Sequence, residues 1–377
     1  MKRTGNLPNM KLTEGPRVRT SPFYDRSKAA GMTVATVYNR MVLPIATDDP
    51  TADYEALTQR VSLWDVGCQR QVQVQGPDAL ELCQYLSARD LSQLRIGAAK
   101  YAPLCDHDGR LINDPVVLRV NEDTVWFSIA DSDVLLWIRA ISGERGDDVE
   151  VSEPDVSPLA VQGPSAADTV AAVFGEWVHE LKFFHFRRIH HEGIPLVVCR
   201  SGWSKQSGFE LFLEDGSKGD QLWDLIWAAG QPHGIRVGAP NNAERIENFL
   251  LSWGSDTDAE SDPFEAAIGR YIDLGATHDF VGKNALLAKR AEGPTRELKG
   301  LLIDGEPLEA NPAPVGLQTP NGSYAGQTRA VVYSPRYERN LGLAIVEVPQ
   351  NLPGTKLQVH TPTGWRPAIV VDLPFDL

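Results

Sequence analysis

Two carboxylates in otherwise apolar sequence are the first candidates for chemistry. Asp114 follows Leu111-Ile112-Asn113 and precedes a proline and two valines, which places it at the mouth of a predicted strand. Glu247 follows Glu244 by three residues on a predicted helix, so both glutamates share one helical face. A carboxylate in such surroundings is partly desolvated and needs N–H or O–H partners. The same patterns are also typical of an aspartate that caps a turn and a glutamate at a helix rim, so residue types alone leave both interpretations open.

A short acidic run, residues 256–262, resembles the start of a calcium-binding loop. Its alternating carboxylates match the first positions of an EF-hand loop, but Ser261 replaces the glycine and Ala267 replaces the final glutamate of that motif. We therefore interpret this run as a solvated acidic loop. The histidines form no HxxxH or HExxH pattern, and no glycine-rich phosphate-binding motif occurs. We expect no metal centre and no nucleotide site of these types.

The charge balance limits the partners of the protein. Its 36 lysines and arginines against 50 aspartates and glutamates leave a net charge of −14, which repels phosphate backbones and anionic lipids. No apolar stretch reaches the roughly 18 residues needed to span a bilayer. We expect a cytoplasmic protein without nucleic-acid or membrane partners. The 4 cysteines have no CxxC spacing and are predicted to be reduced, structural thiols: Cys68, Cys83, Cys105 and Cys199.

The elements that must position these groups follow from the hydrophobic periodicity. Residues 70–75 alternate, which predicts a strand with Val72 and Val74 on its buried face, and Gly76-Pro77 then opens a helix. The same strand, Gly-Pro turn and helix return at Val161-Gln162-Gly163-Pro164. We therefore expect an α+β layer built by duplication.

The second half of the chain predicts a long loop and a separate β domain. Two strands, 194–200 and 209–213, are joined by residues 201–208, a connection that is long for a hairpin and typical of a site. A helix is predicted from about 243 to 251. After a polar connector at 292–296, short strands with Asn-Gly, Pro-Gly and Thr-Gly turns predict an all-β barrel or sandwich. The predicted divisions are an extended arm (1–20), an α+β ligand-binding region of two interleaved lobes (21–285) and a β-barrel domain (290–377).

Several motifs keep a fixed order along the chain. They are Leu63-Trp64-Asp65-Val66, Gln75-Gly76-Pro77-Asp78-Ala79, Tyr101 with Gly109-Arg110-Leu111-Ile112-Asn113-Asp114, Ser201-Gly202-Trp203 with Gly208-Phe209-Glu210, Glu244-Arg245-Ile246-Glu247, and Phe280-Val281-Gly282-Lys283. Together they resemble the folate-dependent aminomethyltransferase (glycine-cleavage T-protein) family. Within it, the likeness is strongest to bacterial dimethylsulfoniopropionate demethylases, through Thr36-Val37-Tyr38-Asn39, residues 157–164, residues 200–206 and Pro240-Asn241-Asn242.

The resemblance implies a three-lobed cloverleaf with a C-terminal β-barrel and tetrahydrofolate bound at its centre. It assigns the following residues to the cofactor, with Asp114 also catalytic: Tyr101, Asp114, Trp203, Glu210 and Glu247. It places Trp203 and Phe212 beside the methyl donor. These residue types suit a pterin, because carboxylates accept its N–H donors and aromatic side chains cover its flat ring.

The activity that the resemblance implies is methyl transfer from a small-molecule donor to N5 of tetrahydrofolate, giving 5-methyltetrahydrofolate. Two donors stay open, dimethylsulfoniopropionate and a methoxylated aromatic acid, because Phe212 stands where a tyrosine is expected in the sulfonium enzymes and residues 252–256 also differ. An aminomethyltransferase of glycine cleavage is less favoured, since residues 240–243 and Leu118 depart from that subgroup, and no lipoyl protein is expected as a partner. A folate-binding factor for RNA modification or iron–sulfur assembly would carry a reactive cysteine motif that this chain lacks. The oligomeric state stays open.

Overall fold

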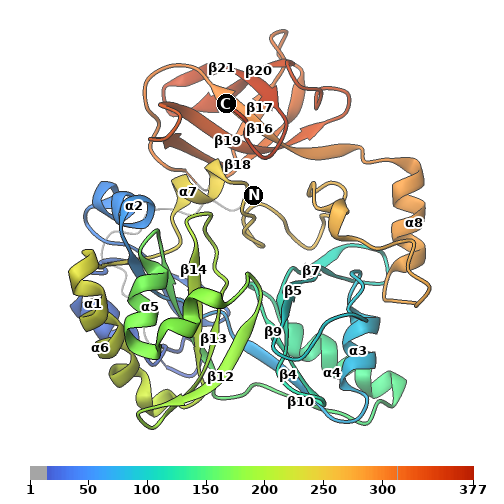
Figure 1. Cartoon of the computed structure of the whole chain (residues 1–377). Coiled ribbons are helices and arrows are strands. Elements are labelled where there is room, and N and C mark those ends of the chain that lie inside the picture. Colours follow the sequence, from blue (N-terminus) through green and yellow to red (C-terminus); the bar gives the residue numbers. More distant parts are fainter. Residues whose placement is uncertain (1–14, 312) are drawn as a thin grey trace.

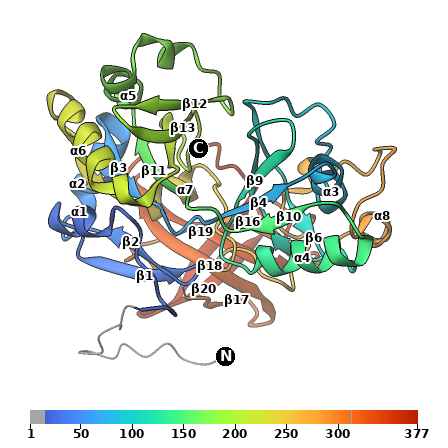
Figure 2. The same cartoon turned by 90° about the horizontal axis from the view of Figure 1, so that it is seen from below.

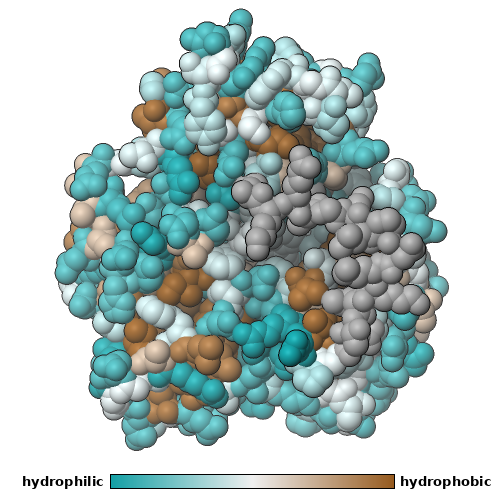
Figure 3. Space-filling view, turned by 180° about the vertical axis from the view of Figure 1, so that it is seen from behind, coloured by the Kyte–Doolittle hydropathy of each residue, from teal (hydrophilic) through white to brown (hydrophobic). Residues whose placement is uncertain are grey.

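The chain forms three lobes around a common centre (Figure 1). The structure is a computed structural model that describes residues 15–311 and 313–377. Seen from below, the sheets of the first two lobes face each other, their helices lie on the outer sides, and the third lobe lies behind them (Figure 2). From the opposite side of the first view, most of the rim is hydrophilic and apolar side chains gather in separate patches (Figure 3).

The first lobe is built on a six-stranded sheet in the order β12-β13-β14-β11-β3-β15. All its strand pairs are antiparallel except β15 with β3. The strands are β3 (Ser62–Asp65), β11 (Ser157–Gln162), β12 (Phe186–His191), β13 (Ile194–Cys199), β14 (Gly208–Leu213) and β15 (Arg236–Gly238). The helices of this lobe are α1 (Tyr24–Ala29), α2 (Pro50–Gln59), α5 (Ala166–Phe174) and α6 (Gly219–Gly230), with short 3-10 turns η1 (Glu176–Glu180), η2 (Gly216–Lys218) and η3 (Gln231–His233).

The second lobe is inserted between β3 and β11 of the first. Its five-stranded sheet has the order β10-β4-β9-β8-β5, and it packs against two helices. The elements are β4 (Gln71–Gln75), α3 (Ala79–Leu86), β5 (Ala99–Tyr101), β8 (Val116–Arg119), β9 (Thr124–Ser128), α4 (Val134–Arg145) and β10 (Glu150–Ser152). Two small two-stranded sheets accompany the lobes, β1 (Val34–Tyr38) with β2 (Met41–Ala46) and β6 (Leu104–Cys105) with β7 (Leu111–Asn113).

The third lobe is a closed barrel of six strands in the order β16-β19-β18-β17-β20-β21. It confirms the predicted C-terminal β-barrel. The strands are β16 (Arg296–Ile303), β17 (Gly316–Gln318), β18 (Tyr324–Ser334), β19 (Arg339–Glu347), β20 (Lys356–Thr361) and β21 (Gly364–Val371). The segment before the barrel contains α7 (Asn242–Glu247), η4 (Gly269–Tyr271) and α8 (Lys283–Glu292).

The predicted duplication is present as two strand, Gly-Pro turn and helix units, β4 with α3 and β11 with α5. Gly76 and Gly163 have φ values of +148° and +123°, in the region that favours glycine. A Cβ on either residue would lie under 3 Å from backbone, 2.3 Å from Asp148 O for Gly76 and 2.7 Å from Arg60 O for Gly163. Both turns therefore require glycine, which explains why each unit has a glycine at this position.

The predicted helix end is wrong, and the predicted arm is described only in part. The helix expected from 243 to 251 ends at Glu247, because the chain turns into a positive φ of +53° at Phe249 and the Asn248 side chain bonds back to the carbonyl of Glu244. Of the predicted arm at 1–20, residues 1–14 lie outside the described residues, and Arg19 is held beside the β1–β2 turn by its N–H bond to Arg40 O. Among the described residues, no helix is long and apolar enough to cross a membrane.

Candidate active site

Asp114 is the first of the candidate carboxylates, and the structure brings it together with Tyr101. Asp114 directly follows β7 and is half-buried, and its Oδ2 accepts a hydrogen bond from the Tyr101 hydroxyl at 3.0 Å. Burial raises the pKa of Asp114 to about 7, although the bond from Tyr101 lowers it, and the nearby Asp256 raises it further. Near neutral pH, Asp114 is therefore poised between its carboxyl and carboxylate forms.

Aromatic rings form a wall beside this carboxylate. The rings of Tyr101 and Tyr271 meet edge to face with centroids 4.8 Å apart. Arg89 stacks over the Tyr271 ring at 5.1 Å and donates a hydrogen bond to Tyr101 O at 2.9 Å, so one cation fixes both tyrosines. Burial raises the pKa of the Tyr101 phenol well above its usual range, which keeps it a proton donor toward Asp114.

The long connection between β13 and β14 carries Trp203. Its indole N–H donates to Leu251 O at 3.2 Å, and the Arg245 guanidinium lies 5.9 Å from the ring centroid. Two residues further on, the N–H of Lys205 donates to Glu244 at 2.8 Å. The loop is therefore attached to α7 and to the chain that follows it.

Glu210 lies in the middle of β14 and is buried. Its only side-chain partner among the described residues is the hydroxyl of Ser201, which donates to Oε2 at 2.5 Å. Burial raises the pKa of Glu210, while the bond from Ser201 lowers it. One carboxylate oxygen of Glu210 thus remains available to a donor from a ligand.

Helix α7 holds the remaining two candidate carboxylates. Asn241 caps it by accepting from the N–H groups of residues 243 and 244. Glu247 accepts from the hydroxyls of Tyr54 at 2.9 Å and Ser334 at 2.6 Å, which joins the helix to the first lobe and to the barrel. Glu244 accepts three hydrogen bonds from neutral donors of its surroundings. Burial is the main cause that raises the pKa of both glutamates.

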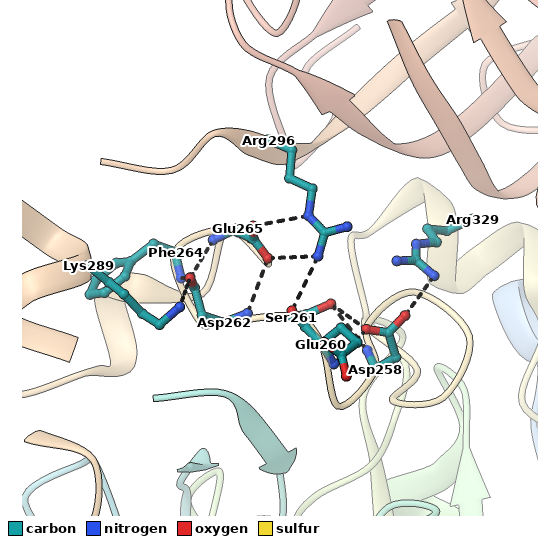
Figure 4. Close-up of polar contacts among 9 residues, drawn as sticks. All are labelled: Asp258, Glu260, Ser261, Asp262, Phe264, Glu265, Lys289, Arg296 and Arg329. Atoms are coloured by element: carbon teal, nitrogen blue, oxygen red, sulfur yellow. Dashed lines mark hydrogen bonds and ion pairs between the residues drawn. The ribbon is translucent and has the colours of Figure 1, made fainter. Parts of the chain in front are cut away.

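The acidic run at 256–262 is not the solvated loop that its sequence predicts. Asp256 is fully buried and pairs with Arg245 at 2.6 Å, while Asp262 is 7% exposed. Further ion pairs tie the run and its continuation to the barrel and to α8 (Figure 4): Asp258 with Arg329 at 3.1 Å, Asp262 with Lys289 at 3.3 Å, and Glu265 with Arg296 at 3.0 Å. The carboxylates therefore satisfy cations from several distant elements. The described residues contain no group of three or more histidine, cysteine, aspartate or glutamate side chains that could hold a metal ion.

We call Asp114, Glu210, Glu244 and Glu247 the central carboxylates. Within 15–311 and 313–377, none of them forms an ion pair, and their side-chain partners are all neutral. Shared neighbours link them. Asp256 lies near Asp114 and pairs with Arg245 of α7, and the Trp203 loop contacts Glu244 of α7 and Glu210. The central carboxylates are thus buried or half-buried acceptors without ion-pair partners, although the charges of Lys205 and Arg336 lower the pKa values of Glu244 and Glu247 in part.

Phe212, predicted beside the methyl donor, lies in the apolar layer between the first two sheets. It is 1% exposed and packs in a cluster with Trp126, their ring centroids 6.5 Å apart. Phe212 shares a sheet face with Glu210, as expected from the alternation of strand side chains. Its packing contacts are with the protein, and its contact with a donor stays a prediction.

Sequence analysis missed the role of Asp256 at the centre of the site. A usable signal was present in Arg245, an arginine next to the apolar Ile246 in a predicted helix, because a guanidinium that becomes buried needs a carboxylate partner. Its partner, Asp256, lies only 11 positions further along the chain. The contact of Tyr54 with Glu247 had no local signal, since the two residues are 193 positions apart.

The residues present fit a bound pterin. Asp256 Oδ1 and Trp253 Nε1 are buried and have no hydrogen-bond partner among the described residues, and Asp256 lies beside Asp114. Buried polar atoms of this kind cost free energy unless a ligand or water pairs with them. A flat ring edged with amino and ring N–H groups would supply donors to the carboxylates and find Tyr101 and Trp203 as aromatic neighbours.

The family of the protein follows from comparison with known sequences. Residues 25–276 match the model of the GCVT N-terminal domain, and residues 296–376 match that of the glycine cleavage T-protein C-terminal barrel domain. The chain belongs to this family, as its motifs predict. It is therefore a folate-dependent enzyme that transfers one-carbon groups, and tetrahydrofolate is the folate that it uses.

Individual proteins of known name are similar to this chain over most of its length. The chain is 43% identical over 354 residues to the dimethylsulfoniopropionate demethylase DmdA of Ruegeria pomeroyi, covering 94% of this chain and 96% of that protein. It is 29% identical to an aminomethyltransferase of Clostridium botulinum, covering 86% and 88% of the two chains. The crystal structure of the glycine cleavage system aminomethyltransferase T from Bartonella henselae superposes with a TM-score of 0.85 at 21% identity, covering 95% of this chain and 98% of that one. The last comparison confirms the cloverleaf fold.

Proposed function

We propose that the protein is a tetrahydrofolate-dependent demethylase that takes a methyl group from dimethylsulfoniopropionate. The observation that carries this proposal is the set of central carboxylates, which are buried or, for Asp114, half-buried, and which form no ion pair among the described residues. Such a centre favours a ligand with a positive charge or many N–H donors, and a sulfonium donor and a pterin provide both. The 43% identity to a dimethylsulfoniopropionate demethylase supports the same donor.

The proposed reaction balances without a metal or a redox partner. The S–CH₃ bond of the sulfonium breaks with its electron pair left on sulfur, the N5–CH₃ bond forms, and the N5 proton is released. The products are 5-methyltetrahydrofolate and a neutral thioether that still carries the donor's carboxylate. Because the thioether is a good leaving group, the protein contributes mainly orientation and electrostatic stabilisation.

In this proposal, each site residue has a physical role. Asp114, Glu210 and Glu247 accept N–H donors of the pterin, and Tyr101 and Trp203 cover its ring. Asp114 is the catalytic residue, because its pKa of about 7 lets its carboxylate hold or release a proton near neutral pH. Trp203 can also turn the face of its ring toward a sulfonium, an attraction of about 0.5–2 kcal/mol.

A methoxylated aromatic acid remains a second candidate donor because of the same property of Asp114. A methyl ether leaves as a phenolate, which needs a proton, and a carboxyl with a pKa of about 7 could supply it at neutral pH. A sulfonium needs no such proton. The two donors therefore demand opposite protonation states of one residue.

The test is a donor panel with direct product detection. The purified protein and tetrahydrofolate would be incubated with dimethylsulfoniopropionate, glycine betaine, vanillate or aminomethylated lipoyl protein. Chromatography would quantify 5-methyltetrahydrofolate from the methyl donors and 5,10-methylenetetrahydrofolate from the aminomethyl donor. We expect product with dimethylsulfoniopropionate, and a loss of at least about tenfold in Trp203→Ala, which removes one stacking face. No product with any sulfonium or ether donor, or unchanged turnover in Trp203→Ala, would reject the assignment.

A further inference from the structure

Gln162, at the end of β11, occupies the neck of the Trp203 loop. Its side chain is fully buried, and its amide N–H₂ lies 3.2 Å from Ser201 O and 3.4 Å from Phe209 O, to which it donates. Its amide oxygen accepts from the hydroxyl of Ser204 at 2.7 Å. One side chain thus bonds the entry, the middle and the exit of residues 201–208.

Two glycines of the loop are shaped around this amide. A Cβ at Gly202 would lie 2.1 Å from Gln162 Nε2, and a Cβ at Gly208 would lie 2.3 Å from the same atom. Any larger residue at either position would push the amide away. The observed loop conformation therefore requires glycine at both positions. The N–H of Gly163 adds a bond to Ser207 O at 3.0 Å and fixes the loop exit to the same turn.

The loop that Gln162 closes carries groups of the proposed folate site. Ser201 donates to Glu210, Trp203 reaches Leu251, and the N–H of Lys205 donates to Glu244. Each contact requires a defined backbone position across 201–205. A loop free at its neck would have to lose this conformational entropy when the cofactor binds.

The duplicated unit supplies an internal comparison. Gln75 ends β4 just as Gln162 ends β11, and both precede a Gly-Pro turn into a helix. Gln75 is exposed, and among the described residues its side-chain oxygen accepts only from Gln73, at 3.2 Å. Burial of the glutamine side chain is therefore not needed for the turn itself, because the same turn forms in the second lobe with an exposed glutamine.

We propose that Gln162 is a positioning residue that presets the Trp203 loop for tetrahydrofolate. Its amide holds Trp203 and the Ser201–Glu210 pair in place before the cofactor arrives, so binding does not have to order the loop. The folate part of this inference rests on the proposed function, whereas the ordering of the loop does not.

The test compares Gln162→Met with the matched control Gln75→Met. Methionine keeps the length of the side chain and removes the amide. In Gln162→Met, we expect amide hydrogen exchange across residues 201–208 to accelerate at least about tenfold and KM for tetrahydrofolate to rise at least about fivefold, with a smaller change in kcat at saturation. Gln75→Met should match the wild type in each measurement.

A second variant displaces the same amide through a substitution in the loop. Gly208→Ala should displace the Gln162 head group, because the new methyl would meet the end of that flexible side chain, and it should reproduce the faster exchange and the higher KM. In a Gln162→Ala background, Gly208→Ala should add nothing further, since the obstructing amide is already absent.

The outcomes separate the two proposals. Wild-type exchange at 201–208 in both Gln162→Met and Gly208→Ala overturns the positioning role, whatever the protein binds. Wild-type protein that binds no tetrahydrofolate overturns the proposed function, while the exchange measurement still decides the role of Gln162. Equal losses in Gln75→Met and Gln162→Met would also reject it, because a general effect of glutamine loss would then explain both.

Discussion

The acidic loop at 256–262 and the central carboxylates place the same functional group in opposite electrostatic surroundings. In the acidic loop, the arginine or lysine partners lie 2.6 to 3.3 Å from Asp256, Asp258 and Asp262. Around Asp114 and Glu210, the partners are hydroxyl groups, and burial raises both pKa values. The pKa of Asp258, in contrast, is lowered, because the arginine and hydrogen-bond partners outweigh its burial.

This difference separates carboxylates that hold the fold together from carboxylates that await a ligand. A buried carboxylate with its own cation is stabilised by that pair, as Asp256 is through Oδ2, and removing its charge leaves the cation without a counter-charge. A buried carboxylate without a cation lowers stability in the empty protein and gains when a donor-rich or positively charged ligand arrives. Variants in the two regions should therefore affect different measurements, stability in one and ligand binding in the other.

The largest expected effect is the loss of stability in Asp256→Asn. The side chains of Asp256 and Arg245 are 0% and 4% exposed, so the variant leaves a buried guanidinium without its counter-charge. Breaking such a pair from one side costs about 3–5 kcal/mol, which urea unfolding would measure directly. Asp133→Asn is the matched control, because its pair with Arg40 is 56% and 64% exposed and should be worth less than about 1 kcal/mol. Similar small losses in both variants would contradict the structural role of Asp256.

Asp114→Asn and Glu247→Gln should weaken ligand binding rather than stability. Each variant keeps the shape of the side chain and removes the charge that accepts pterin N–H groups, a loss on the order of 1.5–3 kcal/mol. We expect tetrahydrofolate affinity to fall at least about tenfold in each, by calorimetry. The free energy of unfolding of the cofactor-free protein should not fall in Asp114→Asn and should rise near neutral pH, since the variant removes a buried charge that has no cation. Wild-type affinity in both variants would remove these residues from the folate site.

The sequence was sufficient for those parts of the fold whose signals are local. Alternation in 70–75, the two Gly-Pro turns and the turn-rich C-terminal region lie within a few residues of the elements that they specify, and the structure has the predicted strands, helices and barrel there. The family motifs then supplied the arrangement of the lobes, which no local pattern contains.

The acidic loop could not be predicted in this way because its cations come from elsewhere in the chain. Arg329 lies on β18, Lys289 on α8 and Arg296 at the start of β16, and nothing near residue 258 or 262 indicates these partners. The prediction that helix α7 continues beyond Glu247 was wrong for a related reason. The apolar residues beyond it keep helical spacing, but they pack against the barrel in a turned conformation.

A smaller effect is expected at the exposed end of the acidic loop. Asp258 is 38% exposed on its side chain, while Arg329 is 9% exposed and has only this carboxylate as its ion-pair partner in the described structure. Asp258→Asn should therefore cost about 1–2 kcal/mol in urea unfolding, between the values of Asp133→Asn and Asp256→Asn. A loss as large as that of Asp256→Asn would show that exposure does not set the order within the loop. Tetrahydrofolate affinity should stay within about twofold of the wild type, because Asp258 is not a central carboxylate.

The smallest expected effect is a dependence of folate affinity on pH that belongs to Asp114 alone. Burial raises the folded-state pKa of Asp114 from 3.8 to about 7, so the folded protein holds this proton more tightly than the unfolded chain does. The contribution of Asp114 to stability is thus present below about pH 4 and is lost as pH rises toward about 7. The carboxylate form accepts pterin N–H groups, so tetrahydrofolate affinity should rise severalfold between about pH 6 and about pH 8.

Asp114→Asn separates this titration from that of other groups. In the variant, tetrahydrofolate affinity should be low and independent of pH across the same range. The decrease in the free energy of unfolding between about pH 4 and about pH 7 should be smaller than in the wild type, by the part due to this one proton. The same profile also separates the donors. Turnover of a sulfonium should rise with the carboxylate form, whereas turnover of a methyl ether should decline above about pH 7, because the carboxyl proton that its leaving group requires is then gone. A wild-type affinity that is independent of pH, with a wild-type-like profile in Asp114→Asn, would mean that Asp114 is no different from the paired carboxylates of the acidic loop.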